Sequence, residues 1–172
     1  MQILELHSLT STQIDDLMAL MYELDPEITV TAEMLERAAK APGTHLFAAV
    51  EETGVGGTDD RQSALRQAQG PTAVPIGHGH IIGCASLCVY ESPTSRKASI
   101  EDVVVNSAFR GQGIGKALME HIIDFARREL APIDIHLTSR PHRIAANELY
   151  QSLGFERRET NVYRMMVRRK NK

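Results

Sequence analysis

Apolar residues recur along the chain with two different spacings, and the changes between them predict alternating strands and helices. Apolar side chains every three or four residues predict four helices, at about 10–24, 32–41, 113–130 and 143–153. Short runs rich in β-branched residues predict six strands, at about 2–7, 45–50, 81–90, 98–106, 133–139 and 161–167. Together they predict an α/β (α+β) fold with a mixed central sheet flanked by helices on both faces.

Polar and turn-forming residues mark the ends of the first two helices. Thr10 and Gln13 have the spacing of a capping box, and Asp25-Pro26 ends the helix that follows. Thr31 is placed to cap the second helix, which Pro42-Gly43 closes.

The stretch between Glu51 and His80 breaks the pattern. Six of the twelve glycines fall here among Thr, Asp, Gln and Ser, with few large apolar side chains to build a core. We therefore expect a flexible hairpin insertion at about 52–79 within a single domain spanning 1–172. Two interpretations stay open: a lid over a substrate, or passenger sequence, because Ser63–Pro71 resembles peptides translated from short repeats in some bacterial genomes.

Composition and charge exclude several classes of protein. The 172 residues are 42% hydrophobic and 24% charged, which is ordinary for one globular domain. Nineteen Lys and Arg against 22 Asp and Glu give a net charge of -3, so no overall positive field attracts nucleic acid or an anionic membrane. No stretch approaches the roughly 18 apolar residues that span a bilayer, and no secretory leader is evident. We expect a cytoplasmic protein without a nucleic-acid or membrane partner.

The two cysteines, Cys84 and Cys88, lie in one predicted strand. Four residues at ~3.3 Å each separate their Cα atoms by about 13 Å, which is too far for a disulfide, so we expect reduced thiols. The seven histidines show no spacing with cysteine or carboxylate that is typical of a metal site, and none is predicted.

The most informative segment is 100–116, in which a strand runs into alternating glycines and then into a helix. Glycine lets backbone N–H groups approach a ligand, and a helix start adds unpaired donors and about half a positive charge. The combination suits phosphate. A Walker A loop would need glycine at 110 and Ser or Thr at 117, and a dinucleotide fingerprint would need glycine at 116, but the chain has Arg110, Ala117 and Lys116. An Arg-x-x-Gly-x-Gly turn remains, in which an arginine can neutralise a pyrophosphate while successive amides bond its oxygens.

This turn resembles the Gln/Arg-x-x-Gly-x-Gly/Ala motif of the GNAT superfamily of acyl-CoA-dependent N-acetyltransferases. A second segment, Ala146–Phe155, resembles the family's helix that ends in Leu-Tyr-x-x-x-Gly-Phe. The resemblance covers 81–167 well, covers the first 50 residues by element order only, and leaves out 51–80. It implies direct transfer of an acetyl group from acetyl-CoA to a primary amine in a ternary complex.

The same resemblance implies where coenzyme A binds. Amides from Gly111 to Lys116 would hold its pyrophosphate, with charge from Arg110 and Lys116. The pantetheine arm would run along Val103–Val105 and meet Asn147, although Arg143 stands where many members carry Asn. The implied cofactor-binding residues are Val103, Val104, Val105, Arg110, Gly111, Gln112, Gly113, Ile114, Gly115, Lys116 and Asn147. The family's bulge in the strand before the turn is not visible in the sequence.

Acetyl transfer needs a base for the amine, a donor for the oxyanion and an acid for the thiolate. Tyr150 is the predicted acid, since a phenol of pKa about 10 can protonate a thiolate and recover its proton from the product. Glu101 resembles the family's base, with Asp102 as the alternative, and carboxylates in an apolar strand point to a site. A backbone N–H within Val103–Val105 would meet the oxyanion.

Regular alternation along this strand predicts which side chains share a face. It places Glu101 with Val103 and Val105 on one face, and Asp102 with Ile100 and Val104 on the other.

The sequence leaves the acceptor open as a small-molecule or peptide amine. A noncatalytic acyl-CoA-binding sensor or interaction module on the same fold is the alternative, and a nucleotide-binding protein is a third. The oligomeric state is also open, a homodimer included.

Overall fold

The computed structural model describes residues 1–51 and 79–167. Residues 52–78 and 168–172, which include nearly all of the expected insertion and the basic end of the chain, lie outside the described residues. The chain forms two compact units that divide after Thr138. The elements of the first unit are β1 (Gln2–Leu6), α1 (Ser11–Leu24), α2 (Ala32–Lys40), β2 (Thr44–Val50), β3 (Ile81–Ser92), β4 (Ser95–Val105), the 3-10 helix η1 (Ser107–Phe109), α4 (Ile114–Phe125), the π-helix η2 (Ala126–Leu130) and β5 (Asp134–Leu137).

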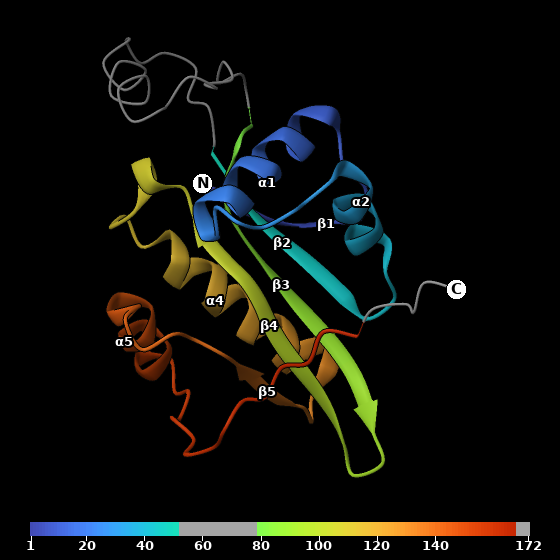
Figure 1. The fold of residues 1–172 in the computed structure, drawn as a ribbon, viewed down its shortest axis with the longest axis vertical. Helices are drawn as coiled ribbons and strands as arrows, with labels where there is room; N and C mark the ends of the chain where they lie inside the picture. The colour runs from blue at the N-terminus through green and yellow to red at the C-terminus, as the bar shows by residue number, and fades with distance from the viewer. Residues whose placement is uncertain (52–78, 168–172) are drawn as a thin grey trace. The chain divides into compact units, whose positions relative to one another are not determined.

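The five strands form one mixed sheet in the order β1-β2-β3-β4-β5 (Figure 1). Neighbours along β1 to β4 are antiparallel, whereas β4 and β5 are parallel. A parallel pair needs a crossover connection, and here α4 supplies it. The crossover carries the chain from the end of β4 through the glycine-rich segment and back across the sheet.

Helices cover both faces of this sheet, as the hydrophobic spacing predicts. On β2, Leu46 and Ala48 pack with buried side chains of α1 and α2. Phe47, between them in sequence, points to the opposite face, where its ring lies 5.3 Å from the rings of His121 and Phe125 on α4. The sheet is therefore the middle layer of a three-layer α/β unit.

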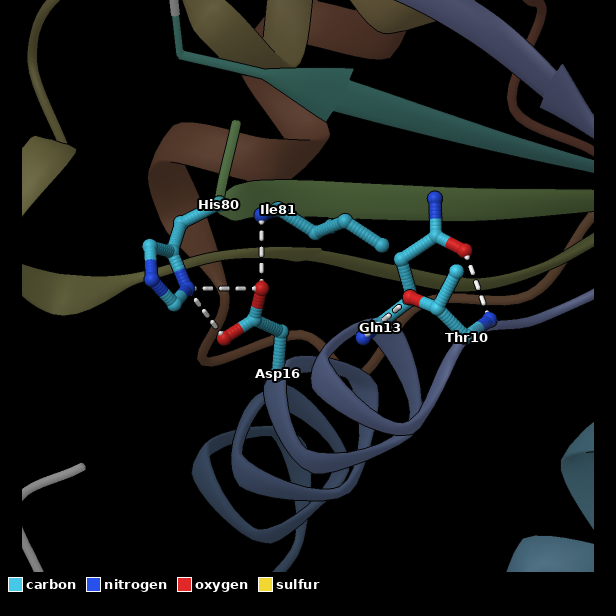
Figure 2. Close-up of polar contacts among 5 residues, drawn as sticks. All are labelled: Thr10, Gln13, Asp16, His80 and Ile81. Atoms are coloured by element: carbon cyan, nitrogen blue, oxygen red, sulfur yellow. Dashed lines mark hydrogen bonds and ion pairs between the residues drawn. The ribbon is translucent and has the colours of Figure 1, made fainter. Parts of the chain in front are cut away.

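The first helix is fixed at its start and along its length (Figure 2). The Thr10 hydroxyl accepts from the Gln13 amide, and the Gln13 side chain accepts from the Thr10 amide, which confirms the predicted capping box. One turn further, the Asp16 carboxylate accepts the Ile81 amide at 2.9 Å and lies 2.7 Å from Nδ1 of His80. Asp16 therefore ties α1 to the first residue of β3.

The turn between α2 and β2 depends on Gly43. Its φ of +78° lies in the left-handed region, and an added Cβ would lie 2.8 Å from the Val89 carbonyl oxygen. The Gly43 carbonyl also accepts the Val89 amide at 2.7 Å. The close approach of β3 to this turn therefore leaves no room for a side chain.

The second unit holds α5 (Ile144–Ser152), which ends in a Schellman motif. Gly154 adopts φ +93°, its amide donates to the Gln151 carbonyl, and the Phe155 amide donates to the Tyr150 carbonyl. The Tyr150 and Phe155 rings meet edge to face, 6.3 Å apart. The spacing Tyr-x-x-x-Gly-Phe is therefore also the spacing that closes this helix.

One expected element is not formed, and one expected helix changes type before its end. The predicted strand at 161–167 is not formed, and Val162, Tyr163 and Met165 are 75%, 87% and 86% exposed. A strand exists only where its backbone groups bond to a neighbouring strand, and apolar composition alone does not provide one. The helix predicted over 113–130 is regular only to Phe125 and continues to Leu130 as a π-helix.

Candidate active site

The segment that joins β4 to α4 forms an open turn, which we call the glycine turn (Arg110–Lys116). Gly111 and Gly113 have φ of +76° and +79°, and an added Cβ at either would have nothing within 4 Å. Gly113 is the N-cap of α4 and provides no side-chain hydrogen bond to it. The first intrahelical bond runs from the Ala117 amide to the Gly113 carbonyl. The amides of Ile114, Gly115 and Lys116 thus precede the helical ladder.

These features fit the pyrophosphate of coenzyme A. Backbone donors at a helix start, with no Cβ above the turn, favour an anion that bonds several amides at once. Lys116 adds a positive charge here. Its ammonium lies 3.7 Å from the Glu120 carboxylate in an exposed pair, which is a weak contact that an anionic ligand can replace.

The Arg110 side chain is hydrogen-bonded to residues outside the glycine turn. Its Nε donates to the Val105 carbonyl at 3.0 Å, and its Nη2 donates to the Glu23 carboxylate at 3.3 Å. The same Glu23 oxygen accepts the Ser107 amide at 2.8 Å. Sequence reasoning did not find Glu23, because it lies 87 residues before Arg110 on an ordinary amphipathic helix.

The strand before the turn carries the bulge that the sequence does not reveal. Cys84 of β3 pairs with Val104, but Ser86 pairs with Glu101, so Ala85 faces two residues instead of one. The extra residue is accommodated at Asp102, whose φ is +53°. Asp tolerates this region better than most residues, and a bulge leaves backbone groups outside the regular ladder.

The bulge overturns the predicted sharing of faces. Glu101 is opposite Ser86 and Val104 is opposite Cys84, so both lie on the face covered by α1 and α2. Ile100 and Val105 are opposite Leu87 and Gly83 and lie on the α4 face. Regular alternation assigns Glu101 with Val105 and Ile100 with Val104, and both assignments are wrong because one extra residue shifts the alternation.

Just before the bulge, β4 leaves its parallel partner. Pairing between β4 and β5 ends at Ile100 and Leu137, whereas β4 continues to Val105. Among the described strands, the β4 edge at 101–105 that faces away from β3 is therefore not paired. An extended ligand can add to such an edge as a further strand would. Val103 and Val105 are partly exposed along it, and Val104 is buried.

Polar side chains gather on the α1/α2 face of the sheet around Glu101. The Ser99 hydroxyl donates to the Glu101 carboxylate, and the Tyr90 hydroxyl lies 3.4 Å from Nε2 of His136. Pairing registers assign polar or titratable side chains of β3, β4 and β5 to this face, among them Ser86, Cys88, Tyr90, Lys97, Ser99, Glu101, Asp134 and His136. We call this set the polar face.

Three groups at this end of the sheet, Asp102, Cys84 and Cys88, have a raised pKa. Desolvation raises the pKa of Asp102, and the negative charge of Glu101 raises it further. Burial likewise raises the pKa of the Cys88 thiol. Both cysteines are free thiols, as expected. Glu101 and Asp102 are both exposed, and of the two, Glu101 accepts a hydrogen bond from the Ser99 hydroxyl.

In the second unit, α5 carries both of its predicted site residues. The Asn147 amide nitrogen donates to the carbonyls of Arg140 at 3.0 Å and Arg143 at 2.9 Å, so its carbonyl oxygen is the atom suited to a ligand N–H. Burial raises the pKa of Tyr150, while the charge of Arg143 opposes the shift. Tyr150 therefore stays protonated at neutral pH, as a proton donor must.

Within the described residues, no three His, Cys, Asp or Glu side chains are grouped to hold a metal ion. No helix of the same part of the chain is long and apolar enough to cross a membrane.

The first unit is thus a three-layer α/β unit with a bulged strand, an open strand edge and a glycine turn at a helix start. The family model for the acetyltransferase (GNAT) family matches residues 15–155, and the chain belongs to that family.

Curated relatives support the assignment. The chain is 36% identical to N-acetyltransferase family 8 member 2 of Rattus norvegicus over 100 residues, which cover 57% of this chain and 44% of the relative. It is 30% identical to the N-alpha-acetyltransferase RimI of Mycobacterium tuberculosis over 79 residues, 46% and 48% of the two chains. It is 39% identical to the streptothricin acetyltransferase of Streptomyces lavendulae over 104 residues, 58% and 52%. The matches thus span about half the length of these relatives.

Solved structures share the fold. An acetyltransferase from Agrobacterium tumefaciens superimposes with a TM-score of 0.69 at 20% identity, covering 96% of this chain and all of that one. AAC(6')-Iy, solved in complex with the bisubstrate analog CoA-S-monomethyl-acetylneamine, gives a TM-score of 0.64 at 18% identity, covering 96% of this chain and 97% of that one.

Proposed function

We propose that this chain is an N-acetyltransferase that moves an acetyl group from acetyl-CoA to a primary amine by direct transfer. The observation that carries the proposal is the combination, in one strand and the turn that follows it, of a bulge beside Glu101 and a row of amides suited to a pyrophosphate. The bulge is proposed to lie at the acetyl group, and the row of amides is proposed to hold the pyrophosphate of the cofactor.

Acetyl-CoA supplies the activated thioester. In the proposed arrangement the amides of the glycine turn hold the pyrophosphate, with charge from Lys116 and Arg110. The pantetheine arm lies along the unpaired edge of β4 at Val103–Val105, and Asn147 accepts a hydrogen bond from it. The family's known dependence on a coenzyme A thioester supports this assignment, as does the neighbour solved with a coenzyme A analog.

In the proposed reaction, Glu101 and Tyr150 carry out the proton transfers. Glu101 accepts the proton of the ammonium, directly or through water, and the neutral amine attacks the thioester carbonyl. A backbone N–H at the bulge, within Val103–Val105, bonds the developing oxyanion. As the C–S bond breaks, Tyr150 gives its proton to the departing sulfur and regains one from the acetylated nitrogen.

The acceptor is proposed to be a cationic amine that binds at the polar face. Hydroxyl, imidazole and carboxylate groups can orient an amine and its neighbouring polar atoms there. The relatives include one named for α-amino groups and one named for streptothricin, which supports an amine and leaves its identity to experiment.

Transfer can be tested by thiol release. The purified chain is incubated with acetyl-CoA and a panel of amines, namely a peptide with a free N-terminus, a lysine peptide, a polyamine and an aminoglycoside, and free thiol is measured. We expect amine-dependent release with at least one class, and a large fall in rate in Tyr150→Phe. If the chain binds acetyl-CoA but releases thiol with none of them, the noncatalytic sensor replaces the enzyme.

A further inference from the structure

Glu23, at the end of α1, contacts the segment that leads into the glycine turn. One oxygen of its carboxylate accepts the Ser107 amide at 2.8 Å and the Arg110 guanidinium at 3.3 Å. Ser107 is the first residue of η1, the short helix between β4 and the turn, and Arg110 is its C-cap. A single side chain from α1 therefore fixes both ends of η1.

The contacts around η1 form a connected set. The Asn106 side chain accepts the Ala108 amide at 3.0 Å, so side chains satisfy the first two amides of η1. Arg110 also donates to the carbonyl of Val105, the last residue of β4, at 3.0 Å, so these contacts connect α1, η1 and β4. The Glu23 side chain is 27% exposed, and its two bonds lie at the protein surface.

The position of Glu23 is unexpected on electrostatic grounds. A carboxylate paired to the arginine of an anion-binding turn repels the anion and shares the positive charge meant for it. The glycines at 111 and 113 carry a separate, entropic cost. An unrestrained glycine segment loses much conformational entropy when a ligand orders it. Fixing the segment in advance lowers the entropy lost on binding.

We infer that Glu23 is a positioning residue of the glycine turn: by holding the Ser107 amide and the Arg110 guanidinium, it orders the turn before the cofactor binds. The inference rests on the proposed function, in which this turn binds the pyrophosphate of coenzyme A. It couples α1, which lies over the sheet near the polar face, to the cofactor-binding end of β4.

The test uses the full chain, with coenzyme A as the probe, in calorimetric titrations of wild type, Glu23→Ala and Glu23→Gln. Glu36→Ala is the matched control, since Glu36 pairs with Lys40 at 3.1 Å on α2, away from the turn. Positioning predicts that Glu23→Ala weakens binding about tenfold, within the range measured for coupled neighbours. Glu23→Gln, which keeps an acceptor for the Ser107 amide and loses the charge, should fall between wild type and Glu23→Ala. The control should change less than twofold.

Hydrogen exchange of the cofactor-free protein gives a second readout. Positioning predicts faster exchange in Glu23→Ala confined to residues 107–116, whereas general destabilisation would also speed exchange in the buried strands. Should Glu23→Ala fail to fold, Glu23→Gln carries both measurements.

The outcomes separate the two claims. If wild type does not bind coenzyme A, the proposed function is wrong. If wild type binds and both Glu23 variants bind equally well or more tightly, repulsion is the dominant effect of Glu23 and the positioning role is wrong. Exchange in 107–116 that is unchanged in both variants would also overturn it.

Discussion

The contact between α1 and β3 offers a direct test of what holds the sheet and its first helix together. The Asp16 carboxylate receives two hydrogen bonds, from the Ile81 amide at 2.9 Å and from Nδ1 of His80 at 2.7 Å (Figure 2). The side chains of His80 and Asp16 are only 8% and 14% exposed. Replacing Asp16 with Ala leaves the Ile81 amide without this acceptor in a region that water reaches poorly.

The magnitude follows from these two bonds. A hydrogen bond to a charged group contributes about 1.5 kcal/mol or more, so Asp16→Ala should lower the free energy of unfolding by about 3 kcal/mol. In a chain of this size, that corresponds to a fall of about 9 °C in Tm. Asp16→Asn keeps the shape and one acceptor oxygen, and should cost about half as much.

Urea denaturation followed by circular dichroism, with thermal melts alongside, measures the change. Thr10→Ala is the matched control on the same helix, because it removes only the cap bond to the Gln13 amide and should cost about 1 kcal/mol. The reasoning would be refuted if Asp16→Ala cost no more than Thr10→Ala, since the Asp16 contact would then add nothing beyond a surface cap.

Three further predictions concern individual positions. Gly43→Ala should destabilise by more than about 2 kcal/mol in the same urea assay, because its Cβ would lie 2.8 Å from the Val89 oxygen at φ +78°; a change below 0.5 kcal/mol, on the order of an ordinary surface substitution, would show that the turn can move. Asp102→Asn should raise Tm at pH 7, because the raised pKa of Asp102 means that its ionised form destabilises the folded chain. The gain in Tm should shrink as pH falls below 3.8, the ordinary pKa of the group, because wild-type Asp102 is then protonated in both the folded and the unfolded chain. A gain that persists at pH 3 would contradict this assignment. Iodoacetamide at pH 7 should modify Cys88 slowly and Cys84 only on unfolding, since burial raises both thiol pKa values and Cys84 is fully buried; mass spectrometry showing Cys84 modified first would contradict the burial.

Much of the fold could be predicted because caps and turns depend on residues only a few positions apart in the sequence. The capping box of Thr10 and Gln13 and the Thr31 cap each depend on neighbours within a few positions, and both are present. The glycine turn was likewise readable, because glycines that need positive φ lie directly before an amphipathic helix.

The remaining features depend on contacts between distant segments. The bulge at Asp102 is set by the register of β4 against β3, and the local sequence Ile100–Val105 does not predict it. Glu23 acquires its role only when α1 packs near η1. The segment 161–167 shows the converse, since a pattern suited to a strand does not form one without a neighbouring strand.

The central claim is that the glycine turn binds the pyrophosphate of acetyl-CoA. The most direct measurement is a calorimetric titration of the purified chain with acetyl-CoA, with ATP and NAD in parallel and Gly113→Val as the local control. The account predicts saturable binding of acetyl-CoA alone and its loss in Gly113→Val, because valine disfavours the φ of +79° that the turn requires. Binding of ATP or NAD without binding of acetyl-CoA would contradict it, and the roles proposed for Glu101, Asn147 and Tyr150 would fall with it.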